Sequence, residues 1–443
     1  MAELEICVNI DLLLCGKWVI PVEPGDTVLE DHAIAVKDGK IIELLPEAEA
    51  VTKYQAAVTQ QLRTHALIPG LINAHTHSPM TLFRGYSDDI PLMKWLNEYI
   101  WPAEQRWISP EFITDGTQLA IAEMIRSGTT CFNDMYFFPE YTAEAAIQAG
   151  IRAVIGLILV DFPSSWAQDA QEYLDKGEQV HDKFKHNPLI RTAFAPHAPY
   201  TVSDAPLQKV AILAEELDLQ IHIHTHETAH EISESLTQYG MRPLRRLHDL
   251  GLVSNRLVAV HMTQLQADEI ELLAKYGVHV VHCPESNLKL ASGLCPVNEL
   301  LVNGINVALG TDGAASNNDL DMLGELHTAA LLAKGVAGDC CAVPAWRALE
   351  LATLNGARAL GMEHQVGSLK AGKDADIVAI DLGGIESRPL YDPLSQIVYA
   401  GGRDQVTDVW VAGRQLLRDR ELLTINTEEI LLKADAWHNR ITS

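Results

Sequence analysis

The feature that most constrains the fold of this chain is a regular alternation of short apolar runs with longer amphipathic stretches between residues 68 and 364. Each apolar run has the length of a buried strand, and the stretches between runs space their apolar residues as a helix does. Eight alternations over roughly 290 residues predict an α/β fold, a (β/α)8 TIM-type barrel whose active site lies where the strands end. The predicted strands are Leu71 to His77, Thr129 to Asp134, Ala153 to Val160, Ile190 to Ala195, Gln220 to His224, Val258 to His261, Val278 to His282 and Asn306 to Gly310.

A doubly wound open sheet would show the same alternation and is the alternative architecture. Neither G-x-G-x-x-G at a strand-to-helix turn nor G-x-x-x-x-G-K-[ST] occurs in the chain, so the barrel is favoured. The predicted helices include Pro110 to Ser127, Ala205 to Leu217, Ala267 to Lys275 and Leu320 to Ala333.

Both ends of the chain carry short β-like segments without helical spacing, and Asp38-Gly39 is a strong hairpin signal between two of them. Each group is too small to close a core alone, so the two are predicted to pair into one small composite β-sandwich domain. The segments are Val8 to Leu14, Ala33 to Val36, Ile41 to Leu45, Asp376 to Ile380 and Val409 to Val411. The predicted division is 1–67 and 365–425 for the β domain, 68–364 for the catalytic barrel and 426–443 for a C-terminal helix.

The charge of the chain restricts its partners. With 33 basic against 59 acidic residues, the net charge is -26, and such a surface repels nucleic-acid phosphates and anionic lipid. The N-terminus lacks a basic and apolar leader, and no apolar run approaches the length that spans a bilayer. Seven cysteines without a C-x-x-C pair are expected to be reduced thiols. We therefore expect a cytoplasmic protein with no nucleic-acid or membrane partner.

Side chains that bind metals stand at the ends of several predicted strands. His75 and His77 lie at i and i+2, on one side of a pleated strand, so both imidazoles can meet one ion. For one such pair alone, a solvated loop histidine and a core histidine would be the simpler interpretation. His224 and Asp312 at later strand ends complete a set that suits Zn²⁺ or Fe²⁺ and leaves a place for water. Because a divalent ion lowers the pKa of bound water from about 15.7 to about 7, Asp312 can take the released proton.

Further titratable side chains lie near this set. Glu227, three residues past His224, is placed to act as a general acid/base, and His261 on the next strand is within reach of the same water. His197 stands in a loop between two prolines, and both packing and binding stay open for it. The remaining histidines near strands, which we interpret as packing or metal-supporting residues, are His222, His226, His279 and His282.

The ordered set of motifs resembles the amidohydrolase superfamily. It consists of His75-Thr76-His77, Pro196-His197-Ala198-Pro199-Tyr200, His224 followed by Glu227, His261, and Gly310-Thr311-Asp312-Gly313. A segment like GSLKAGKDADIVAI, which begins at Gly367, belongs to the composite β domain of that superfamily. Within the superfamily, PGLINAHTH, WLNEYIWPAEQ and SNLKLASG are similar to the 5-methylthioadenosine/S-adenosylhomocysteine deaminases.

The resemblance implies hydrolytic deamination of an adenine nucleoside with one divalent ion per chain, Zn²⁺ before Fe²⁺. The strand-four end offers His197 and not the bridging lysine of two-metal relatives. The partners are then the nucleoside and water, and we expect a homo-oligomer. The roles carried over are metal ligation by His75, His77, His224 and Asp312, proton transfer by Glu227 and Asp312, orientation of water by His261, ribose binding by Glu104, and substrate contacts by His197 and Trp95. Trp101 is expected to be core packing.

One departure from the resembled family concerns the substrate's tail. Relatives that accept the homocysteine tail carry arginine in or after strand three, where it can hold the tail's carboxylate. Here Leu157 to Pro163 is apolar or acidic, and no Lys or Arg occurs between Arg152 and Lys176. We therefore expect 5'-methylthioadenosine, converted to 5'-methylthioinosine, to be a better substrate than S-adenosylhomocysteine. Arg84 and Arg106 are the other candidates in this chain to contact a tail.

Other functions are compatible with the same metal ligands. Guanine or cytosine deamination and triazine hydrolysis would keep the metal set and change the pocket. A non-catalytic barrel scaffold is the alternative of another class, and the intact ligand set with Glu227 argues against it.

Overall fold

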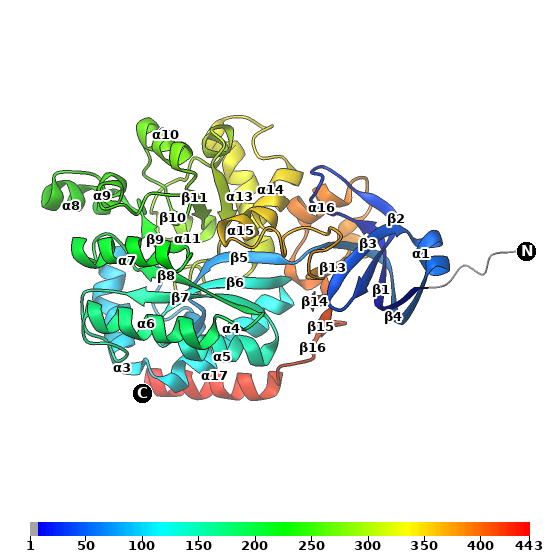
Figure 1. Ribbon diagram of the computed structural model, residues 1–443, viewed down its shortest axis with the longest axis horizontal. Coiled ribbons are helices and arrows are strands. Elements are labelled where there is room, and N and C mark those ends of the chain that lie inside the picture. Colours follow the sequence, from blue (N-terminus) through cyan, green and yellow to red (C-terminus); the bar gives the residue numbers. More distant parts are fainter. Residues whose placement is uncertain (1–7) are drawn as a thin grey trace, which may run out of the picture.

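The computed structural model describes residues 8–443 and contains two eight-stranded sheets (Figure 1). In the first sheet the strands are neighbours in sequence order and pair in parallel, which is the arrangement of a (β/α)8 barrel. The strand prediction is confirmed, because every predicted run ends within two residues of an observed strand. The doubly wound alternative is wrong. The barrel strands are β5 (Leu71–Thr76), β6 (Thr129–Tyr136), β7 (Arg152–Leu159), β8 (Ile190–Pro196), β9 (Ile221–Thr225), β10 (Leu257–His261), β11 (His279–His282) and β12 (Asn306–Leu309).

The barrel closes where β12 returns to β5. The Asp312 amide donates to the His75 carbonyl at 3.1 Å, and the Asn73 side chain bridges the seam through two hydrogen bonds to Thr311, of 2.7 and 3.1 Å. Gly310 permits this approach, since a Cβ there would lie 2.8 Å from the His75 backbone nitrogen. The seam therefore places two predicted metal ligands from opposite ends of the barrel sequence side by side.

Helices surround the barrel, and the four predicted ones correspond to α4, α7, α10 and α13. Side-chain caps begin several of them: Ser109 accepts from the Phe112 amide before α4, and Asp169 accepts from the Glu172 amide before α6. The helices are α4 (Pro110–Arg126), α5 (Pro139–Ala149), α6 (Ala170–Phe184), α7 (Asp204–Glu216), α8 (Ala229–Tyr239), α9 (Pro243–Asp249), α10 (Ala267–Tyr276), α11 (Pro284–Lys289), α12 (Val297–Val302), α13 (Met322–Ala337), α14 (Ala345–Leu351), α15 (Leu354–Ala359) and α16 (Pro393–Ala400).

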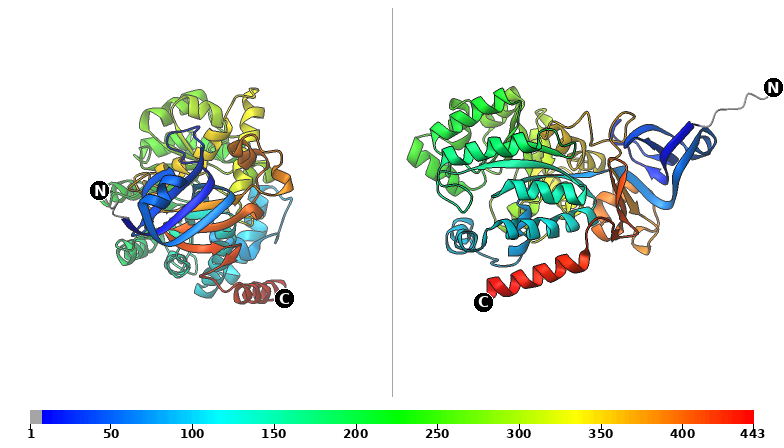
Figure 2. Two further views of the ribbon diagram at one scale, coloured as in Figure 1. Left: turned by 90° about the vertical axis from the view of Figure 1, so that its right-hand side faces the viewer. Right: turned by 60° about the horizontal axis from the view of Figure 1, so that its bottom comes forward.

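The second sheet combines strands from both ends of the chain, so the composite β domain is confirmed (Figures 1 and 2). Its centre is β4 (Tyr54–Pro69), which pairs in parallel with β1 and antiparallel with β13. Asp38 and Gly39 have φ of 50° and 74°, as a two-residue hairpin turn requires. The other strands are β1 (Val8–Val19), β2 (Leu29–Lys37), β3 (Lys40–Pro46), β13 (Ile377–Asp381), β14 (Val406–Val411), β15 (Arg414–Arg418) and β16 (Glu421–Leu422), with α1 (Glu47–Lys53) between β3 and β4.

The two halves of this sheet share one apolar cluster, in which Leu14 and Val36 from the N-terminal strands meet Ile377 and Trp410 from the C-terminal strands. The sheet therefore folds over its own core, as expected for a sandwich-like domain. The predicted boundaries at residues 67, 364 and 425 stay predictions.

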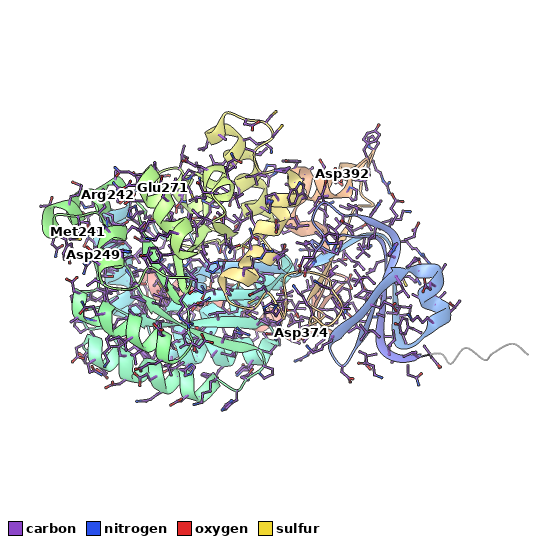
Figure 3. All side chains as sticks on the ribbon, turned by 45° about the horizontal axis from the view of Figure 1, so that its top comes forward. Met241, Arg242, Asp249, Glu271, Asp374 and Asp392 are labelled. Carbon is purple, nitrogen blue, oxygen red and sulfur yellow. The ribbon has the colours of Figure 1, made fainter. Side chains whose placement is uncertain are left out.

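A buried ion pair connects the β domain to the barrel. Arg152 at the start of β7 donates to Asp374 and to Asp376, each at 2.7 Å, and Figure 3 shows Asp374 at the junction of the two parts. The predicted C-terminal helix is α17 (Thr427–Thr442), drawn in red in Figure 2, and it packs against α4, with the Trp437 indole donating to Asp115 at 3.0 Å.

The structure also bears on the predictions about the cysteines and about membrane-spanning segments. The six cysteines within residues 8–443 are free thiols, and Cys7 lies outside the described residues. In the same range, no helix combines the length and apolar character needed to cross a membrane.

Candidate active site

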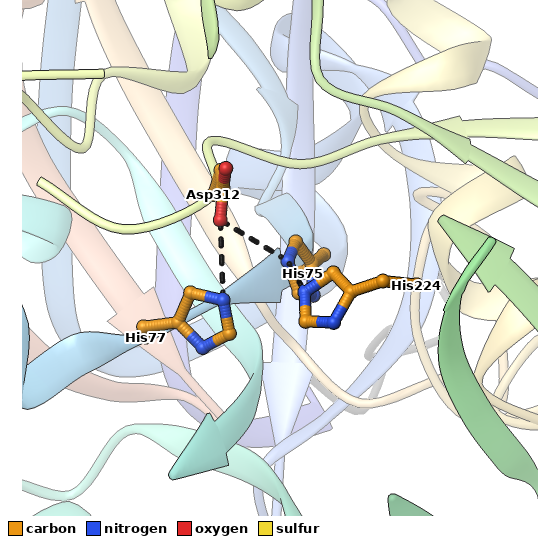
Figure 4. Close-up of side chains that lie close together, drawn as sticks. All are labelled: His75, His77, His224 and Asp312. Carbon is orange, nitrogen blue, oxygen red and sulfur yellow. Dashed lines mark hydrogen bonds and ion pairs between the residues drawn. The ribbon is translucent and has the colours of Figure 1, made fainter. Parts of the chain in front are cut away.

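The four predicted metal ligands converge at the ends of β5, β9 and β12 (Figure 4). Their candidate ligand atoms all lie within 4.8 Å of one another. Asp312 Oδ1 is 3.3 Å from His75 Nε2 and 3.2 Å from His77 Nε2, and His224 Nε2 is 3.1 Å from His75 Nε2. Four side chains from three strands thus point at one small volume.

Hydrogen bonds at the far side of each ring determine which nitrogen faces that volume. His77 Nδ1 donates to the Met135 carbonyl at 2.6 Å and His224 Nδ1 donates to the His197 carbonyl at 2.7 Å. A carbonyl only accepts, so when these rings are neutral, as metal ligation requires, Nε2 of both carries the lone pair. His75 Nδ1 lies 2.9 Å from His222 Nε2.

The chemistry of this donor set fits a divalent cation. Burial lowers the pKa of His75 to about 4 and that of His224 well below its usual value, so both imidazoles are neutral at pH 7. Neutral imidazole nitrogens and a carboxylate oxygen are ligands of Zn²⁺ and related ions. Converging lone pairs beside a carboxylate repel one another unless a positive charge lies between them.

Hydroxyl groups orient the Asp312 carboxylate. Its Oδ2 accepts from Ser286 at 2.7 Å and from Ser316 at 2.8 Å, while Oδ1 accepts from the Gly313 amide at 2.8 Å and faces the histidines. Asp312 has φ of 60°, a left-handed conformation that turns its side chain into the site. Sequence reasoning did not assign the two serines, although both lie inside the motifs SNLKLASG and GTDGAASN.

Glu227 and His261 lie beside the four ligands. His261 Nε2 is 3.9 Å from Glu227 Oε2, and His261 Nδ1 is 2.9 Å from Asn287 Oδ1. Burial raises the pKa of Glu227 above its ordinary value, which favours the protonated carboxyl group that a general acid needs. Glu231 at the start of α8 accepts from the amides of His226 and Glu227, at 3.0 and 2.7 Å, and so holds the turn that carries Glu227.

A pocket is lined by Glu227 and His261 together with His77, His224 and Asp312, and most of its other side chains are apolar, as is usual for small-molecule sites. Its lining includes all the predicted substrate contacts: Trp95, Glu104, His197, Glu227 and Asp312. Trp101 also lines the pocket, so the expectation that it only packs in the core is corrected. The Trp95 indole donates to the Ser87 carbonyl at 2.9 Å.

Glu104 is held by a neighbour on the barrel. The Tyr136 hydroxyl at the end of β6 donates to Glu104 Oε1 at 2.6 Å. Burial raises the pKa of Glu104 to about 7, so its ionisation is poised near neutral pH. Sequence reasoning did not assign Tyr136, because its contact with Glu104 depends on how the helix carrying Glu104 crosses the barrel.

The pocket lining offers little that could hold a carboxylate group of a substrate. Within residues 8–443, no lysine or arginine lines it. Arg84 pairs with Glu123, and Arg106 stacks on Trp107, with 4.5 Å from the guanidinium to the ring centre, so neither candidate reaches the pocket.

The additional histidines lie outside the pocket lining. His222 supports His75, and His226 Nε2 accepts from the Leu244 amide at 3.0 Å. His279 Nδ1 lies 3.0 Å from Asn306 Nδ2, and His282 is buried. These contacts agree with their interpretation as packing or metal-supporting residues.

The sequence pattern of the amidohydrolase family matches residues 66–416 of this chain. The chain belongs to the amidohydrolase family. It is 49% identical over 431 residues to the 5-methylthioadenosine/S-adenosylhomocysteine deaminase of Saccharophagus degradans, covering 97% of each chain. It is also 49% identical to the enzyme of the same name from Teredinibacter turnerae, covering 98% of each.

Solved structures of enzymes are also similar to this chain. A crystal structure of an adenosine deaminase from Xanthomonas campestris with bound zinc is 53% identical, with a TM-score of 0.98 over 98% of this chain and 99% of that one. A triazine hydrolase variant is 26% identical, with a TM-score of 0.90 over 96% and 99%. The prediction of a metal-dependent hydrolytic enzyme of this superfamily is confirmed, and the scaffold alternative is set aside.

Proposed function

We propose that this amidohydrolase deaminates adenine nucleosides, converting 5'-methylthioadenosine and water to 5'-methylthioinosine and ammonia. The observation that carries the proposal is the pocket itself, which Glu227, Asp312 and Glu104 line together beside the converging metal ligands. The names of the relatives and of the zinc-containing neighbour support it.

The proposed cofactor is one Zn²⁺ per chain, with Fe²⁺ as the alternative, held by His75, His77, His224 and Asp312. When bound there, the ion supplies a nucleophilic hydroxide at neutral pH by lowering the pKa of water. The fixed Nδ1 hydrogen bonds of His77 and His224 aim both Nε2 atoms at it.

The proton movements are assigned to side chains of this chain. Glu227, whose pKa is raised by burial, gives a proton to the ring nitrogen next to the carbon that carries the amino group. Asp312 takes one proton from the attacking water as the carbon–oxygen bond forms and gives it to the amino group, which leaves as ammonia when the carbon–nitrogen bond breaks. The second proton of that water leaves the new oxygen as it becomes the carbonyl of the product, and it restores the proton that Glu227 gave to the ring. His261, whose Nδ1 is held by Asn287, presents Nε2 to the same water.

The pocket wall supports the proposed preference among nucleosides. Glu104, fixed by Tyr136, offers a carboxylate to the ribose hydroxyls, and Trp95 and His197 contact the nucleoside. Ile158 near the end of β7, and Val160 and Phe162 just after it, line the pocket with apolar surface. An unpaired carboxylate would be costly to bury there, so 5'-methylthioadenosine is preferred to S-adenosylhomocysteine.

A panel of nucleosides and bases tests the proposal. Ammonia release is measured with 5'-methylthioadenosine, adenosine, S-adenosylhomocysteine, guanine and cytosine, and the first is expected to have the highest kcat/KM. A higher value for guanine or cytosine would overturn the proposed function in favour of those alternatives. Homo-oligomeric assembly and a cytoplasmic location remain predictions.

A further inference from the structure

One helical segment supplies much of the pocket wall. It runs without a break through α2 (Leu92–Trp95), the π-helical turn η2 (Leu96–Ile100) and α3 (Trp101–Trp107). Six of its residues line the pocket, more than any single barrel strand contributes: Leu92, Trp95, Leu96, Ile100, Trp101 and Glu104.

The pocket-lining residues of this segment are spaced in a way that a regular α-helix could not keep on one face. Leu92, Leu96, Ile100 and Glu104 follow one another at intervals of four. A regular α-helix turns ~100° per residue, so each interval drifts by ~40° and Glu104 would lie ~120° around the helix from Leu92. A π turn holds one extra residue in a turn, which rotates everything after it back by ~100° and leaves Glu104 ~20° from Leu92.

Pro102 gives this turn a physical cause. Proline lacks an amide hydrogen and its ring collides with the carbonyl four residues earlier, here that of Glu98, when the helix is regular. In this segment the Trp101 amide donates to the Leu96 carbonyl, five residues back, so the backbone widens just before Pro102. The turn spreads the backbone at the position where a regular helix could not accept the proline.

We propose that Pro102 and the π turn set the rotational phase of this segment, so that Pro102 is a positioning residue for Glu104. The phase brings Glu104 Oε1 to the Tyr136 hydroxyl at 2.6 Å and its carboxylate into the pocket wall. With the phase of a regular helix, Glu104 would turn away from Tyr136 and from a bound ribose. The inference rests on the proposed role of Glu104 as the ribose-binding residue.

The test uses the zinc-loaded enzyme and adenosine, with 2',3'-dideoxyadenosine as the substrate that lacks the hydroxyls. Pro102→Ala should lower kcat/KM for adenosine by roughly 10- to 100-fold, mainly through KM, since the lost contact is a hydrogen bond to a charged group. The dideoxy substrate should be little affected. In a Glu104→Gln background, Pro102→Ala should cause no further loss. Pro110→Ala, at the first position of α4 where no helical hydrogen bond is displaced, is the matched control and should be neutral.

A compensating deletion gives a second, independent readout. Removing the exposed Glu98 from the π turn of the Pro102→Ala variant yields a regular helix in which Glu104 regains its phase, so kcat/KM for adenosine should recover. A Pro102→Ala enzyme with unchanged kinetics, or an equal loss on both substrates, would overturn the inference. A crystal structure of Pro102→Ala that keeps the π turn and the Glu104–Tyr136 contact would overturn it as well. Unchanged kinetics of Glu104→Gln alone would instead refute the ribose role in the proposed function, and the crystal structure would still decide the phase.

Discussion

Replacing Glu227 by glutamine separates proton transfer from the other properties of this side chain. Glu227 is 7% exposed, accepts from the Ser292 hydroxyl at 3.4 Å and lies 3.9 Å from His261 Nε2. Glutamine has nearly the same volume and keeps an oxygen that can accept from Ser292. Its amide cannot deliver a proton to a ring nitrogen. The substitution therefore removes one chemical step and leaves packing intact.

The expected loss follows from the role. General acid/base groups contribute about 10²- to 10⁴-fold, so kcat of Glu227→Gln should fall by roughly 10² or more, with a smaller change in KM. Although its activity falls, the variant should not lose stability against unfolding. Burial raises the pKa of Glu227 above its value of 4.5 in an exposed chain, so its ionisation opposes folding as pH rises through and above that value. The variant should therefore have an equal or higher Tm at pH 7, and the advantage should shrink toward pH 4.

The assay measures initial rates of ammonia release from 5'-methylthioadenosine, together with metal content by elemental analysis and thermal unfolding at both pH values. Glu234→Gln on α8, the helix that follows Glu227, is the matched control, since that side chain is 55% exposed and pairs with His230. Near-normal turnover of a Glu227→Gln enzyme that retains its metal would remove Glu227 from the mechanism.

Three further predictions concern the ion, the substrate and pH. Chelation should abolish activity and Zn²⁺ should restore it, with one ion per chain by elemental analysis; full turnover by metal-free protein would contradict the assignment of the four ligands. The kcat/KM for 5'-methylthioadenosine should exceed that for S-adenosylhomocysteine, and an equal or higher value for the latter would reveal a carboxylate-binding group outside the described lining. Because the pKa of Glu104 is raised by burial to about 7, its carboxylate forms as pH rises through that value, so KM for the nucleoside should fall across this window and Glu104→Gln should flatten the profile. A pH-independent KM in the unmodified enzyme would argue against ribose binding by Glu104.

The sequence by itself determined the elements that depend on local spacing. Apolar runs and helical periodicity located the eight barrel strands, because a buried parallel strand must be apolar on both faces. The spacing of His75 and His77 placed two imidazoles on one side of a strand. Asp38-Gly39 marked the hairpin turn between β2 and β3. The long strand β4 is not predicted separately, since its first half mixes polar and small residues without alternation and the whole strand gains its partners from both ends of the chain.

The tertiary structure alone decided which side chains meet. Closure of the barrel at the seam joins His75 to Asp312, and no local pattern encodes the hydroxyls of Ser286 and Ser316 that orient this carboxylate. Trp101 lines the pocket because the π turn rotates the part of the helix that follows it. The period of a regular helix would place this side chain on another face. Spacing along a chain predicts the direction of a side chain within one regular element, whereas contacts between elements depend on how the whole barrel packs.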